Sequence, residues 1–315
     1  MRATGGDIEA VLERLPLLWP DGRDGQPPRW APLPGGLSHH VYRVDTVEAS
    51  YVLRVLDPAL SELGLSIDPA LELANTALAA ESGAGAAVLA VLEDVPALLL
   101  EFIPGRTLSQ PDIAGHIPGI AAACRRLHAG PRFVGDFDIL ATLAQWLQMC
   151  DRHGLPLPDA FGDRLPEVRA IGAALGKAPL PSVPCHNDLL PENLILSGDL
   201  VRIVDYQVAG NNDPTFELGD IAAEADLDDD ETAALAHAYF GAEATPALLA
   251  RTRLQLILSN VTWPLWFTVH HGLLQPAGGA AGFDYRGEAE DKWRQACRDL
   301  DSGQLGRLLQ EAARG

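Results

Sequence analysis

Cysteine is scarce in this chain of 315 residues, and its four copies are widely spaced. There is no Cys-x-x-Cys pair and no spacing typical of a metal-binding cysteine motif. This pattern excludes a disulfide framework and favours reduced thiols, which are typical of the cytoplasm. The sequence therefore predicts a cytoplasmic protein with four free cysteines, namely Cys124, Cys150, Cys185 and Cys297.

Basic residues are also few. The chain has 23 lysines and arginines against 43 acids, and its formal net charge is -20. A surface this acidic repels a phosphate backbone and an anionic membrane, so neither nucleic acid nor a membrane is expected as a partner. A small cationic substrate would be attracted instead. The composition leaves the oligomeric state open.

Long apolar runs are missing as well. No stretch reaches the roughly 18 consecutive apolar residues that a membrane span requires. The first residues carry acids at Asp7 and Glu9 and lack the apolar core and cleavage site of a secretory signal. The sequence therefore predicts neither a spanning helix nor a secretory signal.

Apolar residues nevertheless make up 47% of the chain, which is ample for one or two cores. In the first hundred residues they form short β-branched and aromatic runs. A helix from Pro69 to about Glu81 is indicated by the capping pair Asp68-Pro69. The runs predict a hairpin at 41–44 and 51–55 and buried strands at 87–92 and 97–102.

The pattern changes after Pro104-Gly105, which breaks the chain, and it becomes mainly helical from about residue 110. These features predict an α+β protein with a small β-sheet lobe over residues 1–103 and a larger, mainly helical lobe over residues 104–315. A ligand site is expected in the cleft between the lobes. In the second lobe the sequence predicts helices at 120–128, 139–152 and 164–175, short β runs at 194–196 and 201–204, and mainly helix after 214.

One stretch carries the residues for phosphoryl transfer. It reads Cys-His-Asn-Asp-Leu-Leu-Pro-Glu-Asn over 185–193 and is followed by Ile-Val-Asp-Tyr over 203–206. Asp188 can orient an acceptor hydroxyl and take its proton, while Asn193 and Asp205 offer the hard oxygen ligands that Mg²⁺ prefers. An Asp-Asn loop can also be turn chemistry, and a lone histidine such as His186 is more often structural. The full His-x-Asp-x4-Asn pattern followed by a hairpin and an Asp favours the catalytic interpretation.

The same stretch resembles the catalytic core of the choline/ethanolamine kinases, within the wider group of aminoglycoside phosphotransferase-like and protein-kinase-like folds. The resemblance implies a two-lobe kinase-like fold that uses ATP and Mg²⁺. It also implies that Asp188 is the catalytic base, that His186 supports the loop, and that Asn193 and Asp205 bind the metal ion.

The first lobe agrees with this resemblance. The run at 33–40, with Gly35, Gly36 and Ser38, is similar to the family's nucleotide-covering loop, although a plain hairpin turn is the alternative. Arg54 lies where the family places its phosphate-binding cation. The remaining nucleotide-site residues implied by the resemblance are Glu72, as the partner of that cation, and the hinge from Glu101 to Ile103, whose backbone would meet the adenine.

The acceptor site is predicted in the second lobe. Glu217, Asp220 and Glu224 share one helix face, where a cation would relieve their repulsion, although a solvated surface is the alternative. The resemblance places Glu224 in the choline pocket. It implies an aromatic cage as well, although aromatic residues at helical spacing are usually core. The remaining acceptor residues are predicted to be Gln207, Asp220, Trp263, Trp266, Phe283 and Tyr285.

Two departures from the family pattern affect the acceptor. Gln207 and Val208 stand where many choline kinases have an acid and a tyrosine, and Asp220 stands where they often have asparagine. Fewer aromatics and more acid favour a primary or secondary ammonium. We expect a kinase for choline or ethanolamine. The alternatives are a kinase for an aminoglycoside, thiamine or another alcohol, and a non-catalytic nucleotide-binding pseudokinase.

Overall fold

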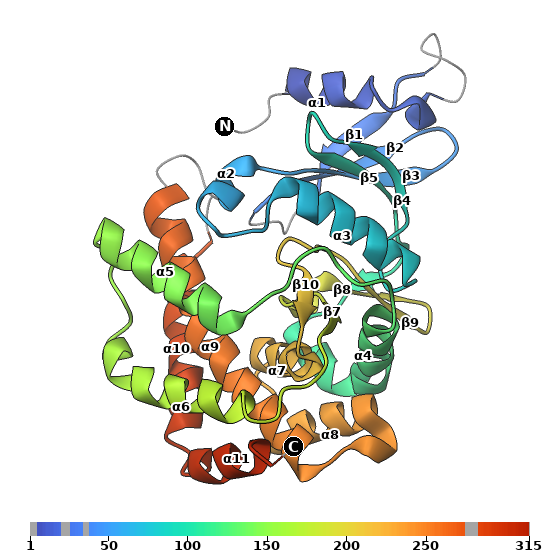
Figure 1. Cartoon of the computed structure of the whole chain (residues 1–315). Helices are drawn as coiled ribbons and strands as arrows, with labels where there is room; N and C mark the ends of the chain where they lie inside the picture. Colours follow the sequence, from blue (N-terminus) through green and yellow to red (C-terminus); the bar gives the residue numbers. More distant parts are fainter. Residues whose placement is uncertain (1–4, 20–25, 34–37, 275–282, 315) are drawn as a thin grey trace.

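The structure is a computed structural model that describes residues 5–19, 26–33, 38–274 and 283–314. It has the two lobes expected from the sequence (Figure 1). A five-stranded antiparallel sheet and its helices form the upper lobe, and a larger group of helices forms the lower one. The predicted α+β architecture, with a small sheet-containing lobe and a larger helical lobe, is therefore confirmed.

The sheet of the first lobe has the strand order β1-β2-β3-β5-β4. The expected hairpin and both expected buried strands are present, with ends that differ by a residue or two. The strands are β1 (Arg29–Pro32), β2 (His40–Asp45), β3 (Ser50–Val55), β4 (Val88–Leu92) and β5 (Ala97–Glu101).

Each face of this sheet is covered by a helix. On one face α3 (Pro69–Glu81) packs Leu73 against Leu98 of β5. On the other face α1 (Gly5–Leu12) packs Ile8 against Leu53 of β3. Because side chains alternate along a strand, the residue after Leu53 points towards α3. Helix α1 was not predicted, although the spacing of its apolar residues would have indicated it.

The second lobe is built around one long helix, α9 (Pro246–Leu274), which is buried along most of its length and continues through Pro264. Within the described residues, neither α9 nor any other helix is long and apolar enough to cross a membrane. The other helices of this lobe are α4 (Ile113–His128), α5 (Ile139–His153), α6 (Leu165–Leu175), α7 (Pro214–Glu224), α8 (Asp229–Phe240), α10 (Tyr285–Leu300) and α11 (Leu305–Ala312).

One predicted helix start was wrong. The helix expected to begin at residue 120 begins at Ile113 and passes through Pro118. Its apolar face begins earlier, because Ile113 and Ile117 are buried with Ile120 in the same core. That packing outweighs the local tendency of proline to break a helix.

Two small sheets carry the central loops of the second lobe. The predicted hairpin is present as β8 (Leu194–Ser197) and β9 (Leu200–Ile203), and β6 (Arg106–Thr107) joins its edge. A second pair, β7 (Val183–Cys185) and β10 (Gly210–Asn212), was not predicted. Together these strands hold both ends of the 186–193 loop and the segment around residue 205.

The segment after β3 crosses to the second lobe. It contains α2 (Pro58–Glu62), and Leu60 and Leu65 are buried in the core of the second lobe. Two tryptophans fasten it there: Nε1 of Trp146 donates to the carbonyl of Gly64 at 2.9 Å, and Nε1 of Trp266 donates to the carbonyl of Leu65 at 3.0 Å. The two lobes are thus joined by this segment as well as by the chain at residues 102–105.

Candidate active site

His186 is fixed by both of its ring nitrogens. The backbone N–H of Asp188 donates to Nδ1 at 3.2 Å, so Nε2 carries the proton and donates to the carbonyl of Val204 at 2.9 Å. Burial lowers the pKa of His186, which favours this neutral form. The imidazole therefore ties the start of the loop to the segment that leads to Asp205.

Asn187 adopts a left-handed backbone conformation, with φ of 68°. Its side-chain amide compensates for this by donating to the carbonyls of Cys185, Val208 and Gly210, each at 3.2 Å. Its amide oxygen accepts from Asn212 at 2.9 Å. These four contacts hold the loop at the turn that precedes Asp188.

Two acids of α7 anchor the same loop from below. Glu217 accepts the backbone N–H of His186 and that of Asn187, both at 2.8 Å, and Asp220 accepts the N–H of Leu189 at 2.8 Å. Both carboxylates are fully buried. The face shared by the α7 acids thus meets backbone donors of the loop. The sequence did not reveal this arrangement, because it depends on packing between distant segments.

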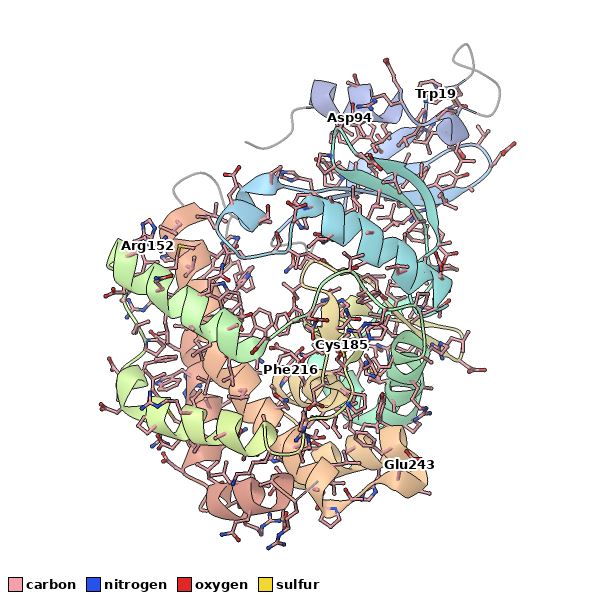
Figure 2. The ribbon with its side chains drawn as sticks, in the orientation of Figure 1. Trp19, Asp94, Arg152, Cys185, Phe216 and Glu243 are labelled. Carbon is pink, nitrogen blue, oxygen red and sulfur yellow. The ribbon has the colours of Figure 1, made fainter. Side chains whose placement is uncertain are left out.

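A buried group of three potential metal ligands lies beneath the loop. Nε2 of His128 is 3.4 Å from Oε1 of Glu217 and 3.7 Å from Sγ of Cys185. Cys185, the member of this group at the end of β7, and Phe216, the neighbour of Glu217 in α7, are labelled near the centre of Figure 2. These contacts are within hydrogen-bonding distance, and Nδ1 of His128 also contacts the hydroxyl of Tyr239 at 2.6 Å.

Asn193 and Asp205 each offer an oxygen atom that could bind a metal ion. Nδ2 of Asn193 donates to the carbonyl of Asp188 at 2.9 Å, so its amide oxygen is the atom left for a cation. Asp205 has φ of 72° and pairs with Arg54 through one carboxylate oxygen. Burial raises the pKa of Asp205, but Arg54 outweighs burial and the pKa is lowered. A carboxylate and an amide oxygen suit Mg²⁺.

Asp188 lies in an acidic, buried environment. Its pKa is raised well above the usual range, first by burial and then by the charges of Asp220, Glu224 and Asp205. Lys292 acts in the opposite direction. A carboxyl group whose pKa is raised in this way accepts a proton more readily than one on the surface.

A buried ion-pair network joins β3 to α3 and to Asp205. Nε of Arg54 donates to Oε1 of Glu72 at 2.9 Å, and the same guanidinium reaches Asp205. His39 completes the network: it accepts the N–H of Asp57 at Nδ1 and donates from Nε2 to Oε2 of Glu72, both at 3.0 Å. Arg54 and Glu72 thus contact each other as the resemblance implied, whereas the part of His39 was missed.

The structure says less about the other residues that were predicted for the nucleotide-binding site. Gly35 and Gly36 lie outside the described residues, and Ser38 is half-buried just after them. Oε1 of Glu101 accepts from the N–H of Ala87 at 3.0 Å and from Arg202 at 2.6 Å. Ile103 is buried in the core beside α3.

A comparison with models of protein families shows the family of this chain. A model of the phosphotransferase enzyme family matches residues 29–254, more than half of the chain and all of the 186–205 stretch. The chain belongs to this family. Arg54, Glu72, Asp188, Asn193 and Asp205 all lie within the matched part.

This phosphotransferase is also similar to individual proteins of known name or structure. LicA of Haemophilus influenzae is 36% identical over 97 residues, which cover 28% of this chain and 36% of LicA. A thiamine kinase of Salmonella paratyphi B is 30% identical over 121 residues, 38% of this chain and 41% of that enzyme. The chain thus spans about two fifths or less of the curated relatives. A solved choline/ethanolamine kinase family protein from Mesorhizobium loti shares 27% identity and a TM-score of 0.82, covering 98% of this chain and 99% of that one.

The predicted acceptor residues of this phosphotransferase are mostly buried. Oδ1 of Asp220 accepts from Ser259 at 2.8 Å and from Nε1 of Trp263 at 2.9 Å. Burial and the charge of Glu224 raise the pKa of Asp220 to about 7. Trp263 and Trp266 are each 4% exposed, and their indole nitrogens make hydrogen bonds to different partners.

The remaining predicted acceptor residues lie around α9 and α10. The rings of Phe283 and Tyr285 are 4.7 Å apart, and Phe283 stacks on Phe267 at 6.1 Å. Gln207 is buried, and its Oε1 accepts no hydrogen bond from the described residues. Glu224 forms an ion pair with Lys292, a residue that sequence analysis did not select.

Proposed function

We propose that this protein transfers the γ-phosphoryl group of ATP to the hydroxyl of a small amino alcohol, with ethanolamine and choline as the first candidates. The observation that supports this most strongly is the meeting of Arg54, Asp205 and the 186–193 loop at one place between the lobes. Each of these groups has a separate task in phosphoryl transfer.

Arg54 is the cation for the ATP phosphates. Glu72 fixes its guanidinium from one side, and the other side is directed towards Asp205. Asn193 and Asp205 would hold Mg²⁺, which supplies charge neutralisation on the phosphates when bound. The planar guanidinium of Arg54 can bind phosphate oxygens in a bidentate manner.

Asp188 is the base. Its carboxylate accepts the proton of the acceptor hydroxyl as the hydroxyl oxygen forms a bond to the γ-phosphorus, and ADP leaves from the opposite side. The raised pKa of Asp188 suits this proton transfer. Three hydrogen bonds, which backbone N–H groups of the loop donate to Glu217 and Asp220, keep the base in position.

Support for an amino alcohol comes from the relatives and from the charge of the site. The similarity to the Mesorhizobium loti protein covers nearly the whole chain, and that protein is of the choline/ethanolamine kinase family. The charges of Asp220 and Glu224 act on Asp188, and Lys292, which is paired with Glu224, offsets part of them. The match to a thiamine kinase keeps thiamine as a second candidate acceptor.

The proposal is tested with purified protein, Mg-ATP and a panel of acceptors, with ADP release as the readout. The panel contains ethanolamine, its methylated forms, choline, thiamine and kanamycin. Turnover with ethanolamine or choline supports the proposal, whereas turnover with thiamine or kanamycin alone contradicts the amino-alcohol assignment. Failure to bind Mg-ATP in a thermal shift assay would indicate a protein without kinase activity.

A further inference from the structure

The acceptor region contains a cation that belongs to the chain itself. Nζ of Lys292, on α10, lies 2.8 Å from Oε2 of Glu224, and it also donates to the carbonyl of Ala223 at 2.9 Å. Both side chains of the pair are only 7% exposed. A lysine this deeply buried requires a partner, and here the partner is the carboxylate expected to face a substrate ammonium.

The pair lies close enough to the base to influence it. The charges of Glu224 and Lys292 both act on the pKa of Asp188, in opposite directions. Glu288 lies one turn before Lys292 on the same helix. Burial raises the pKa of Glu288, and the charge of Lys292 opposes that rise. Lys292 thus lies among acids that include the proposed base and the carboxylate proposed to face the acceptor amine.

Two of the expected cage aromatics are also engaged within the chain. The imidazole of His270 stacks on Tyr285 with ring centres 4.6 Å apart and an angle of 11°. Its centre is 4.8 Å from that of Trp266, at an angle of 30°. One face of each of these rings is therefore taken by His270, which leaves less aromatic surface for a substrate cation.

A quaternary ammonium and a primary or secondary ammonium would bind to such a site through different interactions. A quaternary ammonium has no N–H, so it relies on the net charge of a carboxylate and on aromatic faces. A primary or secondary ammonium donates hydrogen bonds, and a carboxylate already paired with lysine still has lone pairs to accept them. Lys292 repels both kinds of ammonium, but only a primary or secondary ammonium can offset this repulsion with hydrogen bonds.

We propose that Lys292 determines acceptor specificity: by pairing with Glu224 it makes the site select a hydrogen-bonding amine over a quaternary ammonium. The inference rests on the proposed function, because it concerns the acceptor of that same reaction. It assigns the site to acceptors of the ethanolamine type, including singly methylated forms, rather than to choline.

The first test compares kcat/KM for ethanolamine and choline in the wild type, in Lys292→Met and in Arg294→Met. Methionine keeps most of the length of the side chain and removes its charge, and Arg294 is an exposed cation on the same helix. We expect the ethanolamine preference of the wild type to shift towards choline by about tenfold or more in Lys292→Met, mainly through a lower KM for choline. Arg294→Met should keep the wild-type ratio. An unchanged ratio in Lys292→Met, or a wild type that prefers choline, overturns the inference.

A second test needs no variant and no turnover. Binding of methylammonium, trimethylammonium and tetramethylammonium to the wild type with Mg²⁺ and a non-hydrolysable ATP analogue is measured by ligand-observed NMR. We expect affinity to drop about tenfold or more at the last methylation, where the final N–H is lost. Affinity that rises at that step, or no binding of any of the three, overturns the inference. Absence of turnover with every amino alcohol would instead refute the proposed function.

Discussion

Arg54 and Glu72 form a buried ion pair, with Nε of the arginine 2.9 Å from Oε1 of the glutamate. The pair links the central strand β3 to α3, and neither side chain is more than 7% exposed. Burial opposes the charge on Glu72, but Arg54 and His39 outweigh it and the pKa of Glu72 is lowered. The guanidinium of Arg54, the proposed phosphate-binding cation, is therefore held in place by contacts within the chain.

Replacing Glu72 with glutamine should weaken nucleotide binding. The amide keeps the shape but loses the charge that orients Arg54, and hydrogen bonds to charged groups contribute about 1.5–3 kcal/mol. We expect KM for ATP to rise about tenfold or more, with a smaller effect on KM for the acceptor. Glu81→Gln, on the exposed end of the same helix, is the matched control. Equal KM values for ATP in wild type and Glu72→Gln would show that the pair does not position Arg54.

The sequence pattern predicted the local structure of the candidate site, where its residues are close together in the chain. The alternation in β3 and the spacing from Asp188 to Asn193 and Asp205 follow from a hairpin and a tight loop, so residue types and spacing carry enough information. The anchoring of the loop by Glu217 required contacts across about 30 residues, and the pairing of Glu224 with Lys292 joins α7 to α10, which precede and follow α9 in the chain. No local pattern encodes such contacts, because they depend on how the helices pack.

Replacing Glu217 with glutamine tests the anchoring of the loop. A carboxylate gives one oxygen to each of the two backbone N–H groups, whereas an amide has only one oxygen and leaves a buried donor unpaired. We expect the free energy of unfolding to fall by about 1–3 kcal/mol. Denaturant unfolding measures this, and Glu243→Gln, an exposed glutamate, is the control.

The same variant should also show a kinetic signature. A displaced loop moves Asp188 but leaves Arg54 in place, so kcat should fall while KM for ATP changes little. A Glu217→Gln enzyme with normal stability and normal kcat would contradict the anchoring role.

Asp220 should make stability depend on pH. Its pKa is raised to about 7 in the folded protein, whereas an aspartate in the unfolded chain ionises near pH 4. Between these values the unfolded chain has released a proton that the folded protein still holds. The free energy of unfolding of the nucleotide-free protein should therefore fall as pH rises through this window, by up to about 1.4 kcal/mol per pH unit, and level off above it.

The variant Asp220→Asn isolates this contribution. Asparagine does not titrate, so the fall in stability between about pH 4 and pH 7 should become shallower than in the wild type. Urea unfolding at a series of pH values gives both curves. Parallel curves for the two proteins would show that Asp220 titrates at its ordinary pKa.

The central claim is that Asp188 directs phosphoryl transfer from ATP to the hydroxyl of an amino alcohol, and phosphorus NMR tests it most directly. Wild-type protein and Asp188→Asn are each incubated with Mg-ATP and ethanolamine, and Mg-ATP binding to both is confirmed by thermal shift. We expect the wild type to form ADP and a phosphate ester of the alcohol. The variant should bind Mg-ATP yet form the ester about a hundredfold to ten-thousandfold more slowly. Ester formation at similar rates by both proteins would contradict the account.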